Sequence, residues 1–112
     1  MLKKYAIHEE NEPPVGYLYY DTETDLFELE VLEDINLYEM PAFMYFMRQY
    51  NKLRVKDDLA RAFVKERLIP PERQNIAQIL ADLRLPYYDE VLMLEVMRGR
   101  CVMDEFLIDL IE

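Results

Sequence analysis

The segment "LFELEVLE", residues 26–33, decides the fold, because its apolar and charged residues alternate. Phe27, Leu29 and Val31 fall on one face of an extended chain, and the two glutamates between them fall on the other. This two-residue period is typical of a β-strand with one side buried and the other side in water. The segment therefore predicts a sheet whose core lies against one of its faces.

Two more strands are predicted upstream, each separated from the next by a short polar connection. "VGYLYYD", residues 15–21, is joined to the first segment by the polar turn "TETD". "LKKYAIH", residues 2–8, also alternates, with Lys3, Tyr5 and Ile7 on one side, and it precedes a turn segment with two prolines. Connections this short join antiparallel neighbours, so the N-terminal part of the chain predicts a meander.

Downstream of Pro41 the apolar residues recur with a helical period. "PAFMYFMRQYN", residues 41–51, predicts one helix, which begins at a proline suited to a first helical position. "KDDLARAFVKERL", residues 56–68, predicts a second helix, and Asp57 or Asp58 is expected to cap it. The residues expected on the inner faces of these two helices are Phe43, Phe46, Met47, Tyr50, Leu59, Ala62 and Phe63.

The adjacent prolines Pro70 and Pro71 predict a sharp corner, because a residue before proline is pushed out of the helical region. "ERQNIAQILADLRL", residues 72–85, is expected to form a third helix that begins at Pro71 or its neighbour. The prolines would then fix the angle between two packed helices. The inner stripe expected for the third helix is Ile76, Ile79, Leu80 and Leu83.

The remaining sequence predicts a fourth helix and a last strand. "YDEVLMLEVMR", residues 88–98, is apolar on almost every side, so we expect a well-buried helix capped by Asp89. Gly99 is a natural residue to follow its C-terminus. The alternation over residues 106–111 predicts a strand that returns to the sheet.

These elements predict one α+β domain that spans residues 1–112. We expect a small antiparallel sheet, made of the N-terminal meander plus the C-terminal strand, with about four helices packed on one side. A chain of 112 residues corresponds to one domain and is long enough to bury a core without disulfides or metals.

Composition limits the partners and the compartment. The net charge of −10 disfavours direct nucleic-acid binding, which depends on lysine and arginine, and the apolar runs are too short to cross a membrane. The acidity serves solubility, or it presents an acidic surface to a basic partner. Cys101 has no cysteine to pair with, and the N-terminal lysines precede no apolar signal segment, so we expect a cytoplasmic protein.

The residues needed for common catalytic sites are missing. The chain has one histidine, His8, one cysteine, two glycines and no serine. This set is too small for a zinc site, a Cys–His pair, a phosphate-binding loop or a Ser–His–Asp triad. Paired carboxylates could still act as acid and base, as in a small hydrolase or transferase. We expect no enzyme activity, no catalytic residues, no cofactor and no metal.

Two features favour an interaction surface. The chain has nine tyrosines, which suit interfaces but also rim sheets and cores. The segment "MPAFMYFM", residues 40–47, has apolar residues off its inner stripe, so this helix is either buried on most sides or presents apolar surface to a partner. The candidate partner-binding residues are Met40, Phe43, Met44, Tyr45, Met47, Tyr87 and Tyr88.

The order of these segments resembles the small N-terminal subdomain of HipA-type serine/threonine kinases, the toxins of bacterial toxin–antitoxin pairs. The resemblance runs through most of the chain and rests on short motifs in a shared order. Those motifs are Val15-Gly16-Tyr17-Leu18, an aromatic strand around Phe27, Phe63 followed by Leu68-Ile69-Pro70, an arginine-bearing helix over Arg73 to Leu83, and Gly99-Arg100 before the last strand. The family's Pro/Leu/Ser stretch is reduced here to Met40-Pro41, and the last strand lacks the usual small residues before it.

The resemblance implies a function for a stand-alone subdomain. In such kinases the nucleotide site and the catalytic aspartates lie in the large domain that follows, so no catalytic residue is carried over. The expected function is a non-enzymatic interaction module, the partner or antitoxin of a separately encoded HipA-like kinase core. The alternative is an acidic DNA mimic that inhibits a basic nucleic-acid-binding protein.

Overall fold

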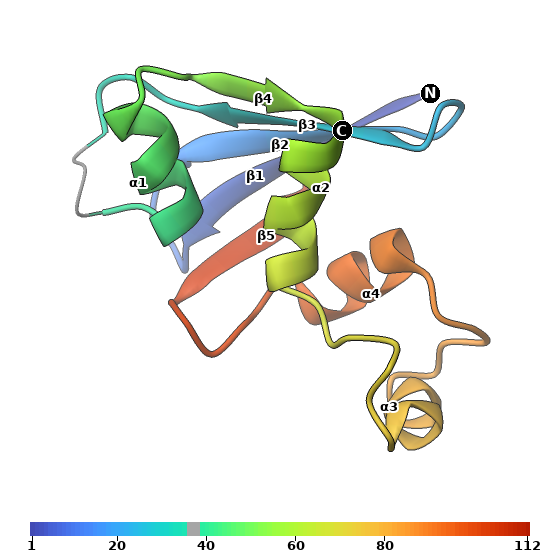
Figure 1. Ribbon diagram of the computed structural model, residues 1–112. Coiled ribbons are helices and arrows are strands. Elements are labelled where there is room, and N and C mark those ends of the chain that lie inside the picture. Colours follow the sequence, from blue (N-terminus) through green and yellow to red (C-terminus); the bar gives the residue numbers. More distant parts are fainter. Residues whose placement is uncertain (36–38) are drawn as a thin grey trace.

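Five antiparallel strands form one sheet in the order β4-β3-β2-β1-β5 (Figure 1). The computed structural model describes residues 1–35 and 39–112. The predicted α+β class, the N-terminal meander and the returning C-terminal strand are confirmed. The strands are β1 (Leu2–Glu9), β2 (Gly16–Asp21), β3 (Leu26–Val31), β4 (Arg54–Lys56) and β5 (Phe106–Leu110).

The helices α1, α2 and α4 lie on one side of the sheet, whereas α3 stands away from it beyond α4 (Figure 1). Their bounds are α1 (Ala42–Gln49), α2 (Asp57–Glu66), α3 (Ile76–Asp82) and α4 (Glu90–Met97). The helix α2 crosses the middle of the sheet and supplies the fully buried side chains Ala60, Phe63 and Val64. The core therefore fills the space between the sheet and this helix layer.

The register places one apolar row on the helix-covered face. Tyr5 lies opposite Leu18, Leu18 lies opposite Leu29, and Leu29 lies opposite Val55 on the edge strand β4. All four side chains are buried. The alternation read from residues 26–33 thus fixes which face of the sheet meets the helices.

The other face of the sheet carries paired charges and tyrosines. The ammonium of Lys4 lies 4.3 Å from the centre of the Tyr17 ring. Arg54 donates to Glu28 over 2.7 Å, and the hydroxyl of Tyr19 donates to Glu30 over 2.8 Å. Cross-strand pairs of this kind keep the face polar and compatible with water.

Sequence periodicity predicted only some of the residues that face the core from α1 and α2. Phe63 and Met47 are buried as expected, but Phe46 is 58% exposed, Tyr50 77% and Leu59 56%, and Ala62 is exposed as well. Met44 takes the position expected for Phe46 and is fully buried. Because α1 is apolar on nearly every side, the period alone could not decide which edge meets the sheet.

The corner at Pro70 and Pro71 is looser than expected. The helix α2 already ends at Glu66, and the chain from Pro71 to Asn75 forms turns, so α3 begins at Ile76 rather than at Pro71 or its neighbour. No residue of α3 is fully buried. The predicted stripe of Ile76, Ile79, Leu80 and Leu83 is therefore only half-buried, and Leu80 and Leu83 pack against the core from its edge.

Capping was predicted correctly for α4 but not for α2. The carboxylate of Asp89 accepts from the backbone N–H of Leu92, and Gly99 follows α4 with a φ of +63°. A side chain there would place its Cβ 2.7 Å from Ile108, so glycine is required. The N-cap of α2 is instead Lys56, without a side-chain cap, and the two aspartates occupy the first turn.

Candidate functional site

An apolar groove lies between α1 and α2 and consists of two adjoining hollows. The upper hollow, of about 280 Å³, is lined by Phe43, Phe46 and Met47 of α1, by Tyr50 just after it, and by Leu59 of α2, with Lys52 and Val55. The lower hollow, of about 460 Å³, continues past Phe43 and Phe46 to Phe63, Glu66 and Met103. We call the two hollows together the α1–α2 groove.

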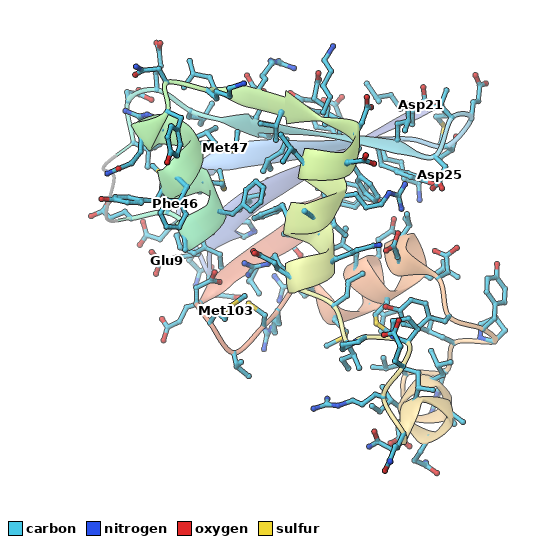
Figure 2. The ribbon with its side chains drawn as sticks, in the orientation of Figure 1. Glu9, Asp21, Asp25, Phe46, Met47 and Met103 are labelled. Carbon is cyan, nitrogen blue, oxygen red and sulfur yellow. The ribbon has the colours of Figure 1, made fainter. Side chains whose placement is uncertain are left out.

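The walls of the groove are exposed aromatic and aliphatic side chains held by a firm floor. The rings of Phe43 and Phe63 meet edge to face at 5.6 Å, which closes the floor between the two helices. Phe46, Met47 and Met103 lie along the same side of the molecule (Figure 2). Covering such a surface with another apolar surface lowers the free energy, because apolar area is removed from water.

The structure places the candidate residues of the sequence analysis in three different environments. Met40, Met44 and Met47 are buried in the core, so their side chains support the groove from below. Phe43 and Tyr45 are half-buried, and Phe43 lines both hollows. The phenol of Tyr45 accepts from Gln49 over 2.7 Å and lines the lower hollow.

Tyr87 and Tyr88 lie in the connection from α3 to α4 and line neither hollow of the groove. Tyr87 is exposed, whereas the hydroxyl of Tyr88 donates to the backbone carbonyl of Ile69 over 2.7 Å. Tyr88 therefore fixes the connection before α3.

Sequence reasoning missed four exposed residues that build the groove. Phe46, Tyr50 and Leu59 were expected in the core, and no functional role was assigned to Met103 from the sequence. The signal for Phe46 was present, because Met40, Met44 and Met47 form a competing stripe at spacings of four and three. No local pattern identified Leu59 or Met103.

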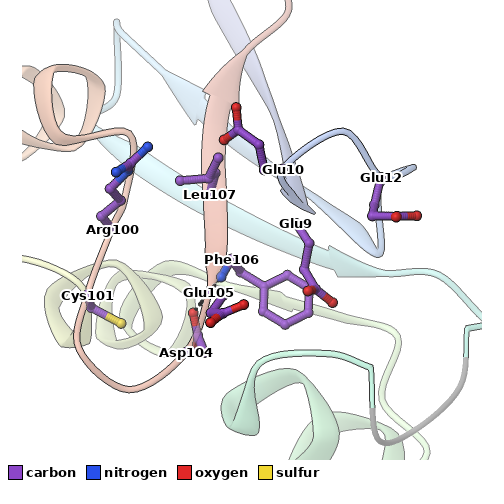
Figure 3. Close-up of a pocket in the computed structure, with 9 residues that line it drawn as sticks. All are labelled: Glu9, Glu10, Glu12, Arg100, Cys101, Asp104, Glu105, Phe106 and Leu107. Atoms are coloured by element: carbon purple, nitrogen blue, oxygen red, sulfur yellow. Dashed lines mark hydrogen bonds between the residues drawn. The ribbon is translucent and has the colours of Figure 1, made fainter.

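An acidic hollow of about 440 Å³ lies beside the lower end of the groove (Figure 3). Asp104 lines both, because it follows Met103 in the chain. The carboxylates come from the end of β1 and the turn after it, and from the entry to β5. They are Glu9, Glu10, Glu12, Asp104 and Glu105, and they surround Phe106 and Leu107 with Arg100 and Cys101 on the far wall.

Arg67 fixes the boundary between the groove and the acidic hollow. The residue is 3% exposed, and its guanidinium donates to both carboxylate oxygens of Asp104, at 2.9 and 2.7 Å. Burial opposes ionisation of Asp104, but hydrogen bonds from Arg67 and the Phe106 amide more than offset it and lower its pKa. Asp104 is thus an ionised structural anchor.

Two further structural pairs join titratable side chains outside the groove. Nε2 of His8 lies 2.8 Å from Asp109, which also accepts two hydrogen bonds from Arg98 on the open side of the sheet. Burial and a hydrogen bond to Glu95 raise the pKa of Tyr5. In residues 1–35 and 39–112 no group of three or more His, Cys, Asp or Glu is arranged to hold a metal. Within the same described ranges no helix has the length and apolar character required to cross a bilayer.

Comparisons with known protein families, with curated proteins and with solved structures found no match for this chain. The resemblance to HipA-type kinases therefore stays a prediction from the sequence.

Proposed function

We propose that this chain is a non-enzymatic protein-binding module that receives its partner in the α1–α2 groove. The observation that carries the proposal is the position of Phe46, Tyr50 and Leu59, which are exposed around one continuous apolar hollow. Covering the exposed parts of these side chains is worth roughly 1 kcal/mol each. Isolated apolar residues on a surface are ordinary, whereas a grouped set around a groove is typical of an interaction site.

The chemistry of the groove fits recognition better than catalysis. Its lining is aromatic and aliphatic, and the charged groups at its lower end are Glu66 and the Arg67–Asp104 pair. Aromatic rings contribute large contact area with little loss of side-chain freedom on binding.

The partner that we propose is a HipA-like kinase core, and this finer identity rests on the sequence resemblance alone. Under this proposal the chain controls a kinase that is encoded separately, as a partner or antitoxin. The acidic-mimic alternative is less favoured by the sheet, because Glu28 and Glu30 on its open face are paired with Arg54. A mimic of nucleic acid would need its carboxylates unpaired and in a row.

The test compares partner capture by two matched double variants. The groove variant is Phe46→Ser with Leu59→Ser, and the control is Leu26→Ser with Val96→Ser, which removes similar apolar area elsewhere on the surface. Tagged wild-type protein and both variants are incubated with native lysate at high salt, and bound proteins are identified by mass spectrometry.

We expect one protein to be captured by the wild type and the control but lost from the groove variant. A kinase-like chain without its own N-terminal subdomain would support the finer proposal. Equal capture by the groove variant, with both variants folded by circular dichroism, would remove the groove as the binding site. A partner held only at low salt would favour the acidic-mimic alternative.

A further inference from the structure

The acidic hollow beside the α1–α2 groove contains carboxylates that the fold does not neutralise. In the part of the chain that the structure describes, Asp104 is paired with Arg67, and Glu10 lies 3.7 Å from Arg98. Within the same part, no ion pair engages Glu9, Glu12 or Glu105. This is unlike the open face of the sheet, where glutamates are matched by lysine and arginine.

Three surfaces meet at this end of the molecule. The groove ends at Met103 and Asp104, the acidic hollow begins at Asp104, and a further hollow of about 300 Å³ shares Glu9 and Glu12 with it. The floor of this further hollow is apolar and includes Val15 and Phe106. Carboxylates around an apolar floor suit a long basic side chain, because its methylene stem packs on the floor while its charged head meets the carboxylates.

The α1–α2 groove also has the form that an amphipathic helix requires. It is bounded by two helices, and a third helix can lay its apolar stripe between them. Such a helix would run from the apolar end near Tyr50 to the acidic end near Asp104. Its residues beyond the groove would then face Glu9, Glu12 and Glu105.

We propose that the segment received by the groove is an amphipathic helix with arginine or lysine at one end, and that Glu9, Glu12 and Glu105 bind these basic residues. The inference rests on the proposed function and adds the chemical class of the partner. Apolar contact supplies most of the affinity, and the charges fix the direction in which the helix lies.

The experiment uses three fluorescent peptides of about 18 residues, long enough to form roughly 27 Å of helix. The first has leucines at helical spacing and arginines clustered at one end. The second replaces the arginines with glutamates. The third has the composition of the first in shuffled order, so that it has charge but no apolar stripe. Fluorescence anisotropy measures the affinity of each peptide for the full chain.

Three proteins are compared with the wild type. The groove variant is Phe46→Ser with Leu59→Ser, and the acidic variant is Glu9→Gln, Glu12→Gln and Glu105→Gln. The charge control is Glu23→Gln, Glu72→Gln and Asp82→Asn, which changes net charge equally at exposed positions elsewhere. All three are checked for an unchanged circular dichroism spectrum.

We expect the arginine peptide to bind the wild type and the charge control alike, and the acidic variant at least about tenfold more weakly at low salt. The glutamate and shuffled peptides should bind the wild type no more tightly than the arginine peptide binds the acidic variant. Equal weakening of binding in the charge control would overturn the proposal, because only net charge would then matter. The proposal would also be overturned if the arginine peptide did not bind the wild type at all.

Failure of this inference can be separated from failure of the proposed function. If the arginine and glutamate peptides bind equally and both are lost from the groove variant, the groove stays a binding site and the basic-partner inference is wrong. If the arginine peptide binds the groove variant as well as the wild type, the groove itself is excluded and both proposals fall.

Discussion

At the scale of single residues, Arg67 joins two parts of the fold that lie far apart in sequence. From the end of α2 its guanidinium donates to the backbone carbonyls of Gly99 and Phe106 and to both oxygens of Asp104. All of these partners are at least 32 residues further along the chain. A buried cation is stabilising only when its donors are satisfied, and here the loop before β5 satisfies them.

Replacing Arg67 with methionine should therefore destabilise the domain by about 3–5 kcal/mol, because Asp104 would be left as an unpaired and partly buried carboxylate. The exposed Arg73 offers a matched control, for which the same substitution should change the free energy of unfolding by less than about 0.5 kcal/mol. Urea denaturation measures both. A cost below about 1 kcal/mol for Arg67→Met would show that the cluster does not hold the loop.

Asp109 should make stability depend on pH in the acid range. Hydrogen bonds from Arg98, and then from His8, lower its pKa from 3.8 to about 2. A carboxyl with a lowered pKa stabilises the fold above its unfolded pKa, and this contribution is lost as pH falls from about 4 to about 2. Because the site is partly open to water, the contribution is roughly 1 kcal/mol.

The variant Asp109→Asn should therefore be less stable than the wild type at pH 6, and the difference should narrow as pH falls toward 3. Urea midpoints at the two pH values measure it. The exposed control Asp82→Asn should show no such narrowing. A constant difference between Asp109→Asn and the wild type across this range would mean that the Arg98 pair contributes nothing to folding.

At the scale of elements, α1 belongs to the core along one edge and lines the proposed binding groove along the other. Its inner edge places the methyl group of Met44 against Gly16, where an added Cβ would lie 2.4 Å away. That Cβ would also lie 2.3 Å from the backbone oxygen of Glu30, which cannot move aside as a methyl group can, so glycine is required here. The outer edge carries Phe46 beside the groove, and Tyr50 follows at the C-terminal end of the helix. Two adjacent faces of one short helix thus serve the fold and the proposed binding site.

Substituting aspartate at Met44 and at Phe46 should separate these two roles. Met44→Asp places a carboxylate in the core and should cost more than about 3 kcal/mol. Phe46→Asp changes an exposed position, should cost less than about 1 kcal/mol and should remove the partner. Thermal unfolding and partner capture measure the two effects. Similar loss of stability in both variants would show that Phe46 also belongs to the core.

The same helix shows why the sequence predicted the element but not its orientation. Proline at position 41 and the apolar period were enough to place α1 within one residue at its start. Which apolar stripe faces inward depends on the sheet, because Met44 packs against Gly16 of β2. The strand β4 was missed for a related reason. It has three residues, too few for a period, and it exists because Arg54 and Val55 pair with β3.

At the scale of the whole molecule, the alternating strands and the buried middle of α2 form one stable body, to which α3 is attached with little burial. The sequence predicted the sheet because each strand carries its own pattern. The sequence overestimated the burial of α3, because a regular apolar stripe does not show how much of the remaining fold is available to cover it. The groove and the acidic hollow could not be predicted, since their walls come from segments up to about a hundred residues apart.

The contrast between the main body and α3 predicts unequal protection of backbone amides from hydrogen exchange. The amides of β1 and β2 pair on both sides within the sheet and should exchange only through global unfolding. The side chains of α3 are at most half-buried, so its amides should exchange through local opening. Their protection should be at least about a hundredfold lower than in β1 and β2. Mass spectrometry of exchange in peptic fragments resolves these segments. Equal protection in α3 and β1 would mean that α3 folds as part of the core, and its half-exposed stripe would then need a covering surface in solution.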